Sequence, residues 1–135
     1  MTNSMTDDEF IGSFENCTLA NESFHHADHV KMAFLYLSRR PVFEAIERFS
    51  AALARFAAAN GKPGLYHETV TWAFLLLIRE RMARAGRRQT WPEFAAANGD
   101  LLTSKDEVLQ KYYRSETLSS SLARSTFLLP DKAIA

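Results

Sequence analysis

The chain has 135 residues, of which 47% are hydrophobic and 24% charged, a composition typical of a soluble globular domain and not of a disordered chain. Sixteen basic residues balance sixteen acidic ones, so no strong overall charge draws the protein to nucleic acid or to an anionic membrane. The single Cys17 excludes an internal disulfide framework and a cysteine-rich zinc site, and no apolar run is long enough to predict a membrane span. The acidic N-terminus lacks the features of a signal peptide, so we expect one cytoplasmic domain over residues 1–135.

Glycine and proline residues separate long stretches of good helix formers, and no stretch alternates polar and apolar residues as a half-buried strand does. Thr6 with Glu9 three residues later has the pattern of a capping box and predicts a short helix over about 7–16. Three long helices are predicted over about 25–39, 41–59 and 66–85. With further short helices at both ends of the chain, the fold class is a compact all-α bundle.

All four histidines fall into two blocks, residues 25–29 and 66–69, and each block opens a predicted long helix. On a helical wheel, His26 heads the apolar stripe of the first long helix, and His29 lies beside it at the i, i+3 spacing. The same construction places His67 at the head of an inward-facing stripe of the third long helix, with Glu68 to its side. The wheel therefore directs imidazole rings from both helices toward the core.

The connections between the three long helices are short, so consecutive helices are expected to run antiparallel. The first and third long helices then run parallel, and their N-terminal ends lie at the same end of the bundle. We therefore expect His26, His29 and His67 to share one pocket there, with Glu68 at its edge.

Imidazoles together with a carboxylate are the ligand set of a catalytic divalent metal, with zinc or iron the best match. The sequence thus predicts a metal site formed by His26, His29, His67 and Glu68. In this interpretation the protein is a small metal-dependent enzyme of the hydrolase or oxygenase type that acts on a small molecule. Glu68 is either the fourth ligand or a general base acting through metal-bound water, and Glu68 and His67 are the candidate catalytic residues.

Two other functions fit the same residues. One is a metal-free acid–base enzyme or small-ligand binder, with His67 as the base, oriented by Glu68 or Asp28, and His26 as a second donor. In a related form, the clustered helix N-termini and histidines bind a carboxylate or a phosphate. The other is a non-catalytic oligomeric interaction protein, for example a homodimer whose interface buries Trp72 or Trp91.

Five arginines fall between Arg79 and Arg88, with only Glu80 to offset them. Such a stretch can bind nucleic acid, but cations also accumulate at solvated helix C-termini, where they meet the negative end of the helix dipole. The second interpretation is the commoner one. We therefore expect neither a nucleic-acid partner nor a membrane partner.

The two histidine blocks also carry a resemblance. Residues 24–30 contain an FxHxxHV motif, formed by Phe24, His26, His29 and Val30, and residues 66–71 contain a YHETxT motif. With these motifs the sequence resembles an uncharacterised family of small bacterial all-helical proteins. The likeness covers about 24–81, and more weakly 91–113. It implies that the two motifs matter, and no known activity comes with it.

Overall fold

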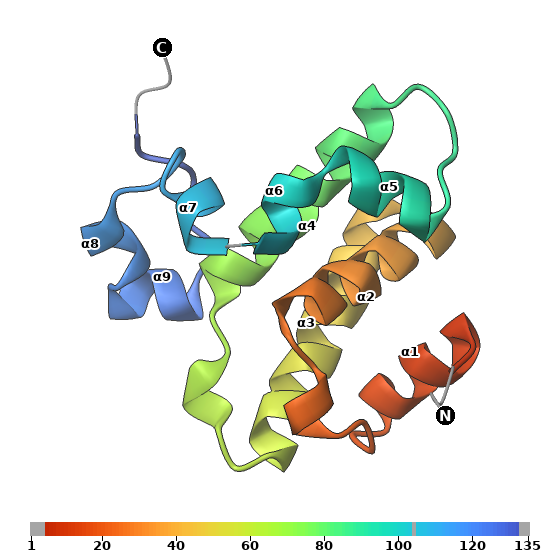
Figure 1. Cartoon of the computed structure of the whole chain (residues 1–135). Helices are drawn as coiled ribbons and strands as arrows, with labels where there is room; N and C mark the ends of the chain where they lie inside the picture. Colours follow the sequence, from red (N-terminus) through yellow and green to blue (C-terminus); the bar gives the residue numbers. More distant parts are fainter. Residues whose placement is uncertain (1–4, 104, 133–135) are drawn as a thin grey trace.

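The computed structural model describes residues 5–103 and 105–132, which form an all-α bundle without a β-strand among them (Figure 1). The predicted fold class is therefore confirmed. In chain order the elements are α1 (Asp7–Glu15), the 3-10 turn η1 (Asn21–Ser23), α2 (His26–Arg39), α3 (Val42–Ala59), the 3-10 turn η2 (Pro63–Leu65), α4 (Glu68–Arg84), α5 (Trp91–Ala97), α6 (Gly99–Thr103), α7 (Lys105–Leu109), α8 (Ser115–Leu118) and α9 (Ser121–Ser125).

The three long helices α2, α3 and α4 contact one another and form the centre of the bundle. Figure 1 shows α2 and α4 running in the same general direction, and α3, which lies between them in the sequence, running in the opposite direction. The N-terminal ends of α2 and α4 consequently lie on the same side of the bundle, as the connection lengths predict. The bounds of all three helices agree with the predicted ranges to within two residues.

The turn after α3 depends on a glycine. Gly61 has a φ of +74°, a left-handed conformation that L side chains rarely adopt. Its N–H donates to the Ala58 carbonyl at 2.9 Å, and the N–H of Lys62 donates to the Ala57 carbonyl, also at 2.9 Å. These bonds satisfy carbonyls at the helix end and fix the backbone where the chain leaves α3.

An aromatic cluster attaches the N-terminal part of the chain to the long helices. Phe14 of α1 has its ring centroid 5.7 Å from that of Phe56 on α3, and Phe24, just before α2, lies 5.3 Å from Phe14. Phe14 is completely buried. Because aromatic pairs at these separations add to the free energy of burial, the cluster stabilises the segment that leads into α2.

The C-terminal segment covers the beginning of α4. The buried Thr69 hydroxyl donates to the Thr126 carbonyl at 2.8 Å and accepts the Leu128 N–H at 3.1 Å. Arg124 of α9 donates to the Gly64 carbonyl at 2.6 Å. This segment is thereby attached both to the first turn of α4 and to the connection between α3 and α4.

Helices α5 and α6 pack on α2 and on each other, with Phe94 and Leu101 completely buried. Arg81 joins α4 to this unit through hydrogen bonds to Asn98 at 2.8 Å and to both carboxylate oxygens of Asp100. Across the described ranges, every helix is too short or too polar to cross a lipid bilayer.

Candidate functional site

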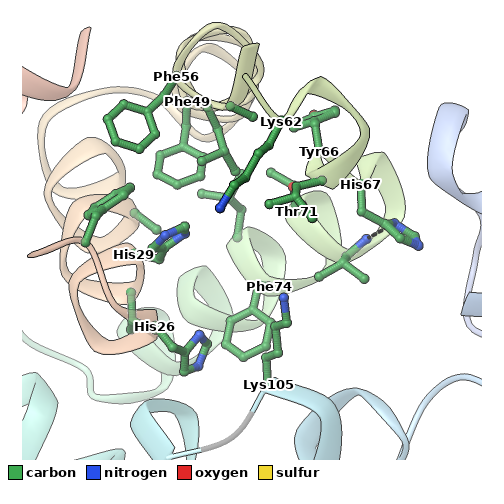
Figure 2. Close-up of a pocket in the computed structure, with 18 of the residues that line it drawn as sticks. His26, His29, Phe49, Phe56, Lys62, Tyr66, His67, Thr71, Phe74 and Lys105 are labelled. Atoms are coloured by element: carbon green, nitrogen blue, oxygen red, sulfur yellow. Dashed lines mark hydrogen bonds between the residues drawn. The ribbon is translucent and has the colours of Figure 1, made fainter. Parts of the chain in front are cut away.

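A cavity of about 550 Å³ lies between α2, α3, α4 and the beginning of α7 (Figure 2). Its size falls within the range of small-molecule sites. Most of its wall is aromatic or aliphatic, formed by Phe24, Val30, Ala33, Phe49, Leu53, Phe56, Ala57, Leu65, Val70, Phe74, Leu75 and Ile78. The cavity lies at the side of the bundle where the two histidine blocks were expected to meet.

His29 lies on the wall of the cavity that α2 forms. Its ring stacks on Phe24, with the ring centroids 4.0 Å apart and the planes 22° from parallel. Burial lowers the pKa of His29 to about 4, and the nearby His26 and Lys105 lower it further, so the ring is neutral near pH 7. A neutral imidazole can donate one hydrogen bond and accept another without adding charge to the cavity.

His26, the first residue of α2, lines the same cavity. Its Nε2 donates to the Leu101 carbonyl at 2.8 Å, and its ring meets Phe74 edge-on at 5.3 Å. Since a carbonyl only accepts, Nε2 carries the proton and Nδ1 keeps its lone pair. Burial lowers the pKa of His26, and the hydrogen bond to Leu101 opposes this effect.

His67 is bonded at both ring nitrogens. Nδ1 accepts the backbone N–H of Val70 at 3.1 Å, and Nε2 donates to the Leu118 carbonyl at 2.7 Å. Figure 2 shows the ring at the edge of the cavity, turned away from His29. With φ −135° and ψ 111°, His67 is the N-cap of α4 and lies outside the helix, so the helical wheel did not apply to it.

The two carboxylates considered with the histidines have other partners. Glu68 accepts a hydrogen bond from the Tyr66 hydroxyl, and burial together with that bond raises the pKa of Tyr66 to about 12. Asp28 accepts the backbone N–H of His25 at 3.0 Å and so caps the start of α2. Neither carboxylate lines the cavity.

The structure thus brings His26, His29 and His67 to one cavity, with both ring nitrogens of His67 bonded within the protein, and Glu68 bonds Tyr66 without lining the cavity. In residues 5–103 and 105–132, no group of three or more His, Cys, Asp or Glu side chains is arranged to hold a metal ion. The divalent metal and the metal-dependent reaction stay predictions from the sequence. The positions of His67 and Glu68 add no support to them.

Two lysines that sequence reasoning did not single out also line the cavity. Lys62 follows Gly61 in the turn after α3, and Lys105 is the first residue of α7. Figure 2 shows their side chains entering the cavity region from opposite sides. A lone lysine in a turn is usually a solvated surface residue, so nothing in the local sequence distinguishes this pair.

The two tryptophans and several of the arginines considered in the sequence analysis have partners within the protein. Trp72 stacks on Phe127 at 5.5 Å, and Trp91 lies 5.6 Å from Phe34. In the basic stretch, Arg84 pairs with Glu80 and Arg87 pairs with Glu93, all partly exposed. Both indole rings thus serve the fold, and, with Arg81, three of the five arginines have partners within the bundle.

Comparisons of the chain with protein-family models, with curated proteins and with solved structures gave no match. The resemblance of the FxHxxHV and YHETxT motifs to a bacterial family therefore stays a prediction.

Proposed function

We propose that the protein binds a small, mostly apolar molecule in the cavity between α2, α3 and α4. The observation that carries the proposal is a cavity of about 550 Å³ with largely aromatic and aliphatic walls. Transfer of apolar surface from water into such walls is favourable by roughly 25 cal/mol per Å². A ligand that fills the cavity gains this free energy.

A few polar groups interrupt the apolar wall and would orient the ligand. His29 is neutral near pH 7, and Thr71 is a buried hydroxyl on α4. His26 keeps an acceptor nitrogen beside Phe74. An apolar pocket with a small number of convergent polar groups is the usual design of a small-molecule site. The proposal corresponds to the metal-free ligand-binding alternative drawn from the sequence.

A neutral fluorescent molecule, 1-aminoanthracene, tests the proposal by titration of the whole chain. Ala57 lines the cavity from α3, whereas its neighbour Ala58 is exposed on the same helix and does not line it. Ala57→Leu fills part of the cavity and should weaken binding by at least about tenfold, which corresponds to about 1.4 kcal/mol. Ala58→Leu should leave binding unchanged.

Thermal unfolding of both variants shows that each is folded before binding is compared. Equal affinity in wild type, Ala57→Leu and Ala58→Leu would place the dye outside the cavity and contradict the proposal. Absence of saturable binding to wild type would contradict it as well. The proposal also requires that dialysis against a chelator leave the affinity unchanged, whereas a ligand that binds through a metal would be lost.

A further inference from the structure

We propose that the ligand is an organic acid whose carboxylate lies between the ammonium groups of Lys62 and Lys105 while its apolar body fills the cavity. This inference rests on the proposed function and adds the chemical class of the ligand. It follows from three observations: the charged residues that line the cavity are basic, the two lysine side chains have no partner among the described residues, and they enter the cavity from opposite sides.

The charged side chains that line the cavity are all basic, although the chain as a whole has equal numbers of acidic and basic residues. The cavity wall contains two lysines and no aspartate, glutamate or arginine. The complete sequence has sixteen basic and sixteen acidic residues, so a general excess of lysine does not account for this. Lysines that line an apolar cavity, with no carboxylate among the lining residues, attract an anion and repel a second cation.

Neither lysine is used by the fold. Among the described residues, Lys62 and Lys105 form no ion pair or hydrogen bond through their side chains. Other lysines in the chain do have such partners: Lys31 lies 3.9 Å from Asp7, and Lys132 donates to the Gln110 carbonyl at 2.8 Å. The two ammonium groups at the cavity are therefore available to a ligand.

The backbone directs both lysines to the same place. The N–H of Lys62 is bonded to the Ala57 carbonyl at 2.9 Å, which fixes the turn after α3, and Lys105 begins α7 on the other side of the cavity. Figure 2 shows the two side chains converging from these opposite sides. A carboxylate in the cavity would therefore face a lysine from each side.

The type of cation favours a carboxylate. Phosphate sites commonly combine arginine forks with several backbone N–H groups, and no arginine lines this cavity. Lysine acts as a point charge and suits a compact anion. The interaction of a carboxylate with an ammonium group is also stronger beside an apolar wall than in bulk water, because the effective dielectric constant is lower there.

The test compares two dyes that differ in one substituent. 1-Anthracenecarboxylate is an anion near pH 7, whereas 1-aminoanthracene is neutral. Fluorescence titration of wild type should give at least about tenfold tighter binding of the carboxylate. Lys62→Gln and Lys105→Gln should each weaken binding of the carboxylate several-fold and leave binding of the amine unchanged. Lys111→Gln, at an exposed lysine away from the cavity, is the matched control and should change neither.

Added salt gives a second measurement, because exposed charges are screened over a Debye length of about 8 Å at physiological ionic strength. The advantage of the carboxylate should shrink as salt is raised. Equal binding of the two dyes, or a carboxylate affinity that both lysine variants leave intact, would overturn the organic-acid inference while the proposed function stands. Failure of both dyes to bind would overturn the proposed function itself.

Discussion

The ring of His67 connects α4 to α8, because its Nε2 donates to the Leu118 carbonyl at 2.7 Å while its Nδ1 accepts the Val70 N–H. One side chain thus caps a long helix and holds the C-terminal segment against it. This segment also bonds the connection between α3 and α4, which forms one border of the cavity.

Replacement of His67 separates these two roles. His67→Ala loses both hydrogen bonds and should lower the free energy of unfolding by about 1–3 kcal/mol, measured by urea denaturation. His67→Asn restores an acceptor for the N-cap but does not reach the Leu118 carbonyl, so its loss should be smaller. Equal stability of wild type and His67→Ala would show that neither bond matters to the fold.

His29 should make stability depend on pH. The folded protein holds the pKa of His29 at about 4, below its ordinary value of 6.5, because burial disfavours the charged ring. Between these two pH values the unfolded chain binds the proton more strongly than the folded chain does. The contribution of His29 to the free energy of unfolding should therefore fall as the pH drops from 6.5 toward 4, by up to about 3 kcal/mol, and level off below that.

The variant His29→Gln isolates this contribution, since it removes the titrating group and leaves His26 and the carboxylates in place. Urea denaturation at a series of pH values should give a shallower slope for His29→Gln than for wild type between pH 4 and 6.5. Parallel curves for the two proteins would mean that His29 titrates near its ordinary value in the folded chain.

Thr69 should contribute to stability through its hydroxyl and not through its size. Thr69→Val keeps the shape of the side chain but leaves the Thr126 carbonyl and the Leu128 N–H without their partner. The expected loss is about 1–3 kcal/mol. Thr69→Ser keeps the hydroxyl and should lose less. Thermal unfolding checks the order, and a valine variant as stable as the serine variant would contradict it.

Substitutions of Arg81 and Arg84 compare the contributions to stability of an arginine that joins two elements and of one that pairs within its own helix. Arg81 reaches Asn98 and Asp100 across two elements, whereas Arg84 pairs with Glu80 four residues away on the same exposed helix face. Arg81→Ala should cost about 1 kcal/mol and Arg84→Ala less than about 0.5 kcal/mol. A larger effect of Arg84→Ala in urea denaturation would reverse this assignment.

The long helices could be predicted because their ends are marked in the sequence. Pro41 precedes α3, and Gly61 terminates it with the positive φ that glycine permits. The helical stripe between them buries Ile46, Phe49 and Phe56. Short connections then fixed the relative directions of α2, α3 and α4. These signals are local, because they depend on the backbone preferences of individual residues such as proline and glycine.

The site was predicted only in part. His26 and His29 lie within or beside the apolar stripe of α2, and both reach the cavity. His67 also lines the cavity, but it precedes the first helical residue, and the Leu118 carbonyl that its ring bonds comes from a remote segment that no wheel includes. Lys62 and Lys105 meet only through the tertiary fold, and no spacing rule connects them.

A direct measurement of the occupied cavity is a two-dimensional NMR titration of alanine methyl groups with 1-anthracenecarboxylate. Ala33 and Ala57 line the cavity, and Ala58 and Ala96 are exposed away from it. We expect saturable shifts of the Ala33 and Ala57 methyl signals, caused by the aromatic ring current, with the Ala58 and Ala96 signals unchanged. Shifts confined to the exposed alanines, or no saturable shift at Ala33 and Ala57, would contradict it.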